Sequence, residues 1–240
     1  MHAITQALKR GHSDIVSLLS AAGAALNPCE AEEKTHCDSA EQMKIAANIV
    51  VTRHRGEGCV QPEYTLVFRD FNTFVADVKL RGGCFYFEVE ILAMENSFED
   101  LGFDDIVQFG VCTDGFEASD ANSNSEGAGD DAWSWAVDGC RQTKWHLGAQ
   151  GAFSSRWVTG DVIGFVLDMR VAAAAVMNIS VNGSFAAPNG VAFSDVDAPY
   201  LSPAFSGYGR FRLNFGLRPF AHPPLDATVT SVHAFHLQNL

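Results

Sequence analysis

The feature that most constrains this fold is a change in the spacing of apolar residues near residue 45. Beyond that point apolar side chains recur at every second position, which is the period of a β-strand with one buried face. Phe85, Phe87 and Val89 would point to one side of such a strand, and Tyr86 and Glu88 to the other. The main part of the chain is therefore predicted to be all-β.

Turn signals divide this region into short strands. Asn182-Gly183 is a strong hairpin signal, because a type I′ turn needs two positive φ values that Asn and Gly tolerate. Regular short strands with turns between them favour a sandwich of two antiparallel sheets. The expected strands are residues 84–92, 107–113, 133–137, 162–168, 176–182, 200–205 and 210–215.

Residues 1–26 have a helical period instead and are expected to form a short α-helical hairpin. Ile15, Leu18 and Leu19 share one helix face, and Gly23 would end that helix. The run GHSDIVSLLSAAGAALN resembles the second half of an ankyrin repeat. No second copy follows, although about three repeats are needed to bury their faces, so an ordinary amphipathic hairpin is the alternative. Residues 27–44 begin Asn-Pro and are predicted to be a linker.

The charge balance limits the partners that the chain can have. It holds 16 Lys and Arg against 29 Asp and Glu, a formal charge of -13, and its cations are not clustered. Such a chain would repel a phosphate backbone, so neither nucleic acid nor an anionic membrane surface is expected as a partner. No signal peptide or apolar span is evident, which predicts a cytoplasmic protein without membrane insertion. The six cysteines lack a framework spacing and are expected to be reduced thiols.

The sequence does not favour a metal site. Cys29, His36 and Cys37 have the wrong spacing for structural zinc, and a fourth ligand is missing. The acidic segments at residues 95–105 and 117–130 could suggest calcium. Neither has the alternating oxygen ligands of an EF-hand, so solvated loops are the favoured interpretation.

No catalytic motif is present, and we expect no enzyme activity and no cofactor. The sequence lacks a G-x-S-x-G elbow, a Walker loop and H-E-x-x-H, and Gly207-Tyr208-Gly209 does not continue into a dinucleotide-binding motif. Asp104-Asp105 and Asp130-Asp131 could suggest a glycosidase, but adjacent acids point to different sides of the backbone.

In order along the chain, several motifs resemble those of the SPRY domain family, and GDDAWSWAVDG with RQTKWHLG is most similar to the SPRY domains of ryanodine receptors. Two departures are MRVAAAAV at residues 169–176, in place of a short turn, and a long segment at 95–105. The resemblance implies a bent antiparallel β-sandwich over residues 45–220, followed by a C-terminal extension, 221–240. Its motifs are GCFYFEVEI (83–91), FGVC (109–112), GDDAWSWAVDG (129–139), KWHLG (144–148), WVTGDVIGFVLD (157–168), ISVNG (179–183), YLSPAF (200–205) and LNFG (213–216).

The resemblance also implies a function, the binding of a peptide segment or partner surface through loops at one edge of the sandwich. Phe71, Trp145 and Tyr208 are aromatic anchors of the kind found at interface hot spots, and Asn72 and Ser206 could read a peptide backbone. The partner's identity cannot be read from these loops. The full set carried over from the family is Asp70, Phe71, Asn72, Thr73, Trp145, His146, Ser206, Tyr208 and Gly209.

The dense aromatic stretch at residues 130–168 is interpreted as framework. Trp133, Trp135 and Trp157 are expected to pack in the interior, whereas Trp145 fits either a core or a binding role. Two other functions stay open. One is a carbohydrate-binding sandwich that uses exposed Trp and Asp, and the other is a structural subdomain of a larger assembly.

Overall fold

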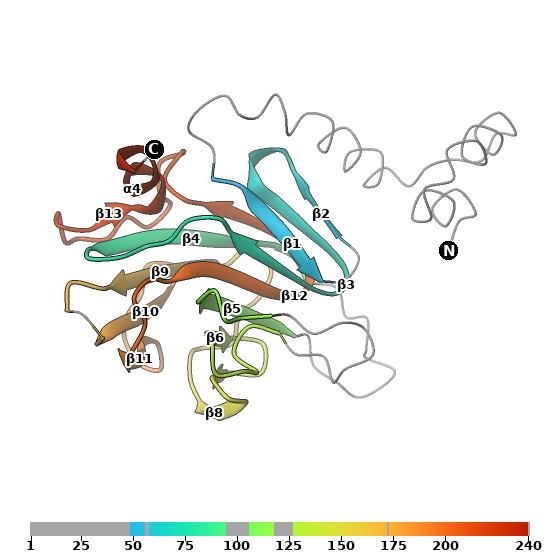
Figure 1. Ribbon diagram of the computed structural model, residues 1–240. Helices are drawn as coiled ribbons and strands as arrows, with labels where there is room; N and C mark the ends of the chain where they lie inside the picture. Colours follow the sequence, from blue (N-terminus) through green and yellow to red (C-terminus); the bar gives the residue numbers. More distant parts are fainter. Residues whose placement is uncertain (1–48, 56–57, 95–105, 118–126, 172, 240) are drawn as a thin grey trace, which may run out of the picture. The chain divides into compact units, whose positions relative to one another are not determined.

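A computed structural model describes residues 49–239, apart from 56–57, 95–105, 118–126 and 172. The expected ankyrin-like helix pair, 1–26, and the expected linker, 27–44, lie outside the described residues. The described chain is all-β, antiparallel except for one short parallel pair, and has one short C-terminal helix, which confirms the predicted fold class at that level (Figure 1).

The described strands join in one sheet, and its path runs β11-β10-β9-β4-β12-β5-β6-β7-β8, with β3 also bonded to β12. The strands β1 and β2 pair with β3, and the short β13 pairs in parallel with β4. The elements are β1 (Val51–Arg55), β2 (Gly58–Gln61), η1 (Pro62–Tyr64), β3 (Thr65–Ala76), β4 (Cys84–Ala93), β5 (Val107–Cys112), β6 (Ser134–Asp138), β7 (Thr143–Trp145), β8 (Ala149–Ala152), β9 (Val162–Asp168), β10 (Ala175–Val181), β11 (Gly190–Val196), β12 (Ser202–Asn214), β13 (Thr230–Ser231) and α4 (Val232–Gln238).

The sheet forks along β12. One edge of this strand pairs with β3 through most of its length, while the other edge pairs first with β5 and then with β4. The exchange falls at Gly207-Tyr208-Gly209. The two glycines have φ values of 153° and 112°, and a side chain on either would collide with the carbonyl oxygen of Ile106 or of Ala93. Glycine is therefore required where two backbones approach β12 this closely.

Two arms leave the fork, β4-β9-β10-β11 and β5-β6-β7-β8, and their outer strands meet again. Lys144 on β7 donates to the carbonyl of Ala192 on β11 at 2.9 Å, and Ser154 Oγ donates to Asn189 Oδ1 at 3.1 Å. The expected division into two separate sheets is not found, because β12 is hydrogen-bonded to both arms. The arms are parts of one curled sheet.

Aromatic rings from both arms fill the space that the sheet encloses. Phe87 of β4 stacks on Phe165 of β9 with ring centroids 4.7 Å apart. Phe109 of β5 meets Phe211 of β12 edge to face at 4.8 Å and stacks on Trp157 at 5.8 Å. Aromatic pairs in these geometries add about 1 kcal/mol each to the burial of apolar area. The core is thus organised around β12 and the first strand of each arm.

The alternation along β4 buries Phe85, Phe87 and Val89 as predicted, but its second face is buried too. Tyr86 Oη donates to the carbonyl oxygen of His222 at 2.8 Å, and Glu88 accepts from the backbone N–H of the same residue at 2.8 Å. The prediction that β4 has one buried face was therefore wrong, because the C-terminal segment covers the other.

The expected C-terminal extension is bound to β4 along much of its length. β13 pairs with β4, and the helix α4 begins after Ser231, whose hydroxyl accepts from the N–H of Ala234 at 3.1 Å. Val232 is fully buried, and the ring of Phe235 lies 4.9 Å from that of Phe85. Residues 221–239 therefore bury apolar surface that the sheet would otherwise expose.

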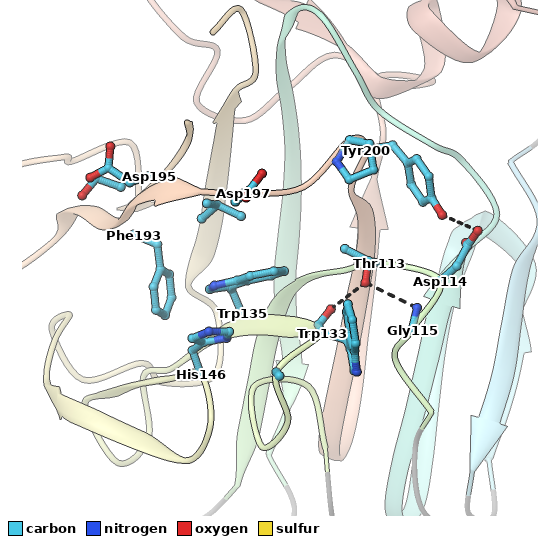
Figure 2. Close-up of a pocket in the computed structure, with 14 residues that line it drawn as sticks. Thr113, Asp114, Gly115, Trp133, Trp135, His146, Phe193, Asp195, Asp197 and Tyr200 are labelled. Carbon is cyan, nitrogen blue, oxygen red and sulfur yellow. Dashed lines mark hydrogen bonds between the residues drawn. The ribbon is translucent and has the colours of Figure 1, made fainter. Parts of the chain in front are cut away.

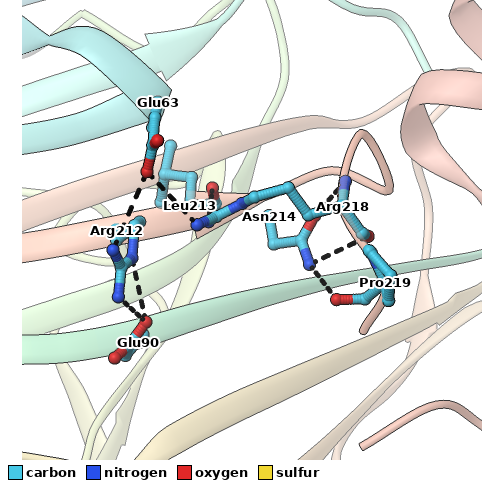
Figure 3. A network of polar contacts seen from close by, with 7 residues as sticks. All are labelled: Glu63, Glu90, Arg212, Leu213, Asn214, Arg218 and Pro219. Carbon is cyan, nitrogen blue, oxygen red and sulfur yellow. Dashed lines mark hydrogen bonds and ion pairs between the residues drawn. The ribbon is translucent and has the colours of Figure 1, made fainter. Parts of the chain in front are cut away.

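A polar network fixes the turn that leads from β12 into this segment (Figure 3). The Arg212 guanidinium lies 2.6 Å from Glu90 of β4 and 3.8 Å from Glu63, which in turn lies 3.6 Å from Arg218. Asn214 donates to the carbonyl oxygen of Arg218 at 3.3 Å. Because these charges are partly exposed, each pair adds less than about 1 kcal/mol, and the network serves mainly to orient the turn.

The predicted Asn182-Gly183 turn is present. Their φ values are 49° and 78°, and Val181 N–H donates to the carbonyl oxygen of Ser184 at 3.2 Å. The positive φ values at both central residues are those that a type I′ turn requires. The residue types at positions 182 and 183 were therefore sufficient to predict this turn.

Three cysteines, Cys84, Cys112 and Cys140, are free and buried, as expected for reduced thiols. Burial raises the pKa of Cys112 to about 12, so its reactive thiolate is scarce near neutral pH.

The fork predicts a difference between two glycines that share a backbone conformation. Gly209 (φ 112°) would bring a Cβ into the Ala93 carbonyl, whereas Gly151 (φ 119°) has nothing within 4 Å. Both Gly→Ala changes incur about 1 kcal/mol of backbone strain. Gly209→Ala should lower the free energy of unfolding by about 2 kcal/mol more than Gly151→Ala, measured by urea denaturation. Equal losses would contradict the close approach at the fork.

Candidate functional site

The sequence-predicted residues at 70–73 and 205–209 lie inside β3 and β12, and not in loops as expected. The two segments are paired neighbours, with Thr73 opposite Ser206 and Asn72 opposite Gly207. The resemblance implied a loop at 205–209, but Gly207 and Gly209 allow β12 to continue through the fork. For Asp70 and Asn72 the structure describes the backbone only, which belongs to β3.

Phe71 and Tyr208 are in contact across these strands. Their ring centroids are 5.7 Å apart, with the planes tilted by 51°. Phe71 is 8% exposed, whereas Tyr208 is half-buried. Gly209, beside Tyr208, is buried at the fork. The structure therefore brings the two predicted anchors together, with Phe71 beneath and Tyr208 nearer the surface.

The polar members of the predicted site are used within the chain. Thr73 and Ser206 are fully buried, and their hydroxyl oxygens are 2.9 Å apart. Ser206 Oγ also accepts from the backbone N–H of Ala128 at 2.9 Å, and Gln108 Nε2 donates to Asp130 Oδ1 at 3.0 Å. These bonds hold residues 127–130 against the sheet, so the expectation that Ser206 reads a peptide backbone is not supported by its partners.

Residues 127–130 lie between Phe71 on one side and Trp145 on the other. A side chain at Gly127 would meet Phe71 Cζ at 2.6 Å, and one at Gly129 would meet Trp145 Cβ at 2.5 Å. Two glycines are therefore needed for the segment to fit between the aromatic residues. The Arg141 guanidinium covers the Trp145 ring at 4.1 Å from its centroid, which leaves that side chain half-buried.

Arg141 is positioned by a buried acid. Its Nε donates to Asp138 Oδ2 at 2.6 Å, and its backbone N–H donates to Oδ1 at 2.9 Å. Asp138 is fully buried, and burial raises its pKa, although Arg141 and the N–H of Val107 act in the opposite direction. This pair fixes the face of Trp145 that Arg141 covers.

His146 belongs to a different place, a pocket of about 520 Å³ beyond the end of β5 (Figure 2). Its ring stacks on Trp135 with centroids 4.7 Å apart and planes within 10°, and Nδ1–H donates to the carbonyl oxygen of Ser134 at 2.9 Å. The structure therefore separates His146 from Phe71 and Tyr208, with which the sequence had grouped it.

Trp133 also lines this pocket, and 54% of it is exposed. The expectation that it packs in the interior was wrong, whereas Trp135 and Trp157 are buried as predicted. Trp133 precedes β6 and lies against Gly115, where a Cβ would meet its ring at 2.5 Å. The sequence pattern did not predict this exposed indole, which is supported by Gly115.

The remaining walls of the pocket are aromatic and acidic. Asp114 accepts from Tyr200 Oη and lies 2.5 Å from the Lys79 ammonium. The bond from Lys79, followed by the one from Tyr200, lowers the pKa of Asp114 below its ordinary value. Asp195 and Asp197 are exposed, and among the described residues neither forms an ion pair.

The fold defines an all-β domain built on one curled antiparallel sheet. The family model of the SPRY domain matches residues 84–218, more than half of the chain, and the chain therefore belongs to the SPRY domain family. The SPRY domain of human HERC1 has a similar structure, with a TM-score of 0.50 and 22% sequence identity over 67% of this chain and 94% of that one. At this identity the likeness shows the fold alone.

SPRY domains are protein-interaction modules and not a family of enzymes. In the part of the chain that the structure describes, no helix is long and apolar enough to cross a membrane. Within the same residues no group of three or more His, Cys, Asp or Glu side chains is arranged to hold a metal. The specific similarity to ryanodine receptors and the ankyrin-like repeat stay predictions.

The charge at the pocket rim can be tested through Asp114. Lys79→Met removes the main cause of its lowered pKa, so this pKa should rise toward the ordinary value, as measured by ¹³C NMR titration of the carboxyl group. Lys144→Met is the control, because that ammonium bonds the carbonyl of Ala192 instead. An unchanged pKa of Asp114 in Lys79→Met would contradict the assignment.

Proposed function

We propose that this chain is a protein-interaction module that binds a peptide segment or partner surface at the fork of its sheet. The observation that carries the proposal is the contact between Tyr208 and Phe71, which holds a half-buried aromatic side chain at one fixed place. Interface hot spots are enriched in tyrosine and lie in well-packed surroundings. Tyr208 is therefore the residue that we assign to direct contact.

The other predicted residues take supporting parts in this proposal. Phe71 packs beneath Tyr208, and Thr73 and Ser206 hold the adjoining strands and residues 127–130 in place. A surface that is already ordered binds with less loss of conformational entropy. Asp70 and Asn72 lie on β3 beside this position, and we propose them as flanking contacts.

Trp145 and His146 are assigned separately. Trp145 lies beyond residues 127–130, and Arg141 covers its ring, so we propose it as an outer contact for a partner that extends past Tyr208. His146 stacks on Trp135 in the pocket. A partner bound at Tyr208 would contact His146 only if it extended from the fork to this pocket.

The proposal is tested by affinity capture with the full chain as bait and quantitative mass spectrometry. Tyr208→Ala should reduce the recovery of captured proteins by about tenfold or more, since truncating a central aromatic anchor removes about 2 kcal/mol of binding. Tyr208→Phe keeps the ring on Phe71 and should retain most binding.

The matched control is Phe185→Ala, which removes an aromatic side chain that is 38% exposed. Phe185 belongs neither to the fork nor to the pocket lining. This variant should leave capture unchanged, and thermal melts should confirm that every variant is folded. Wild-type recovery by both Tyr208→Ala and the double variant Phe71→Ala with Tyr208→Ala would contradict the proposal and favour a structural subdomain.

A further inference from the structure

The pocket described above lies at the opposite end of β5 from the fork. β5 begins at Val107, beside Gly207, and ends at Cys112, after which Thr113 and Asp114 enter the pocket lining. Six residues of strand span about 17 Å. A ligand held in this pocket is therefore distinct from a side chain docked on Tyr208.

Aromatic groups form much of the lining. Trp133 and Trp135 come from the start of β6, and Phe193 and Tyr200 come from β11 and the segment before β12 (Figure 2). Most of these rings are held by neighbours, since Trp133 lies on Gly115 and Trp135 is stacked with His146. Rigid aromatic walls bind planar or cationic groups with little loss of conformational entropy.

The charge of the pocket selects between these ligands. Asp114, Asp195 and Asp197 line it, and no lysine or arginine is among its described lining residues. The register of β11 shifts near Asp195, whose φ is 58°, and such bulges redirect side chains. Asp114 is already paired with Lys79, so the exposed carboxylates of Asp195 and Asp197 are the ones that favour a cation and disfavour an acidic or phosphorylated ligand.

The chain itself shows that these rings accept cations. The ammonium of Lys79 lies 4.5 Å from the centroid of Tyr200, and that of Lys144 lies 5.3 Å from the centroid of Phe193. Both are within the distance at which a cation is attracted to an aromatic face. Lysines of the chain itself therefore lie over two of the aromatic rings that line the pocket. Among the described residues no cation lies over the exposed ring of Trp133.

We propose that this pocket binds a basic side chain, arginine in preference to lysine, presented by a peptide segment of a partner protein. A planar guanidinium stacks on indole and bonds a carboxylate through two N–H groups at once, which an ammonium cannot do. The volume, about 520 Å³, is within the range of peptide and small-molecule sites. The site goes beyond the one at Tyr208 and does not depend on it.

The test uses the full chain and the indole N–H signal of Trp133 in ¹H–¹⁵N NMR, assigned with Trp133→Phe. The probe is acetyl-Gly-Arg-Gly-amide, with matched peptides that carry Lys, Gln or Glu in place of Arg, and methyl glucoside as the sugar. The arginine peptide should shift the signal saturably and lose affinity as salt is raised. The lysine peptide should bind more weakly, and the Gln and Glu peptides and the sugar should not saturate.

Substitutions then separate this site from the fork. The double change Asp195→Asn with Asp197→Asn should weaken binding of the arginine peptide by about tenfold, since exposed carboxylates contribute to both charge and hydrogen bonding. Asp77→Asn changes an exposed carboxylate outside the pocket lining and should have no effect. Tyr208→Ala should leave arginine binding unchanged, so either proposal can fail alone.

Three results would overturn this inference. The first is an equal response to the Gln peptide, which would remove the role of charge. The second is saturable binding of methyl glucoside without binding of the arginine peptide, which would indicate a carbohydrate site. The third is unchanged affinity in the Asp195→Asn with Asp197→Asn variant, whose exposed positions should not disturb folding.

Discussion

The structure depends on one strand having three neighbours. β12 can pair with β3 on one edge and with both β5 and β4 on the other only if the backbone passes Ile106 and Ala93 without side chains in the way. Gly207 and Gly209 meet that requirement, and Tyr208 is placed between them. The curl of the sheet, the enclosed aromatic core and the two separated candidate sites all follow from this exchange of partners.

The outer face of the sheet near the fork is occupied by the chain itself. Ser206 binds the backbone of Ala128, Gln108 binds Asp130, and Gly127 packs against Phe71. A partner therefore meets a surface from which most of the predicted polar contacts have been withdrawn. This explains why Tyr208 is assigned to direct contact, while the residues around it are assigned to holding its position.

Much of the fold could be predicted because it rests on local pattern. The period of two along β4 placed Phe85 and Phe87 in the core, and Asn182-Gly183 fixed its turn through the conformations that those residue types tolerate. The burial of Glu88 could not be predicted, because its partners at residues 221 and 222 are far away in sequence.

The candidate sites were predicted less well for a related reason. The family resemblance placed residues 205–209 in a loop, and the glycine pair in this segment does not by itself distinguish a loop from a forked strand. The motif WSW gives two tryptophans at alternate positions, yet β6 begins between them, which buries Trp135 and exposes Trp133. Separating His146 from Phe71 would have required knowledge of the strand order in the sheet, which the sequence does not contain.

The most direct measurement of the central claim is amide hydrogen exchange of the full chain, with and without a captured partner. A bound partner should slow exchange at the fork, in residues 206–210 and in the paired part of β3, and should leave the β9–β10 hairpin around Asn182-Gly183 unaffected. Protection confined to that hairpin or to α4, with exchange at the fork unchanged, would contradict that claim.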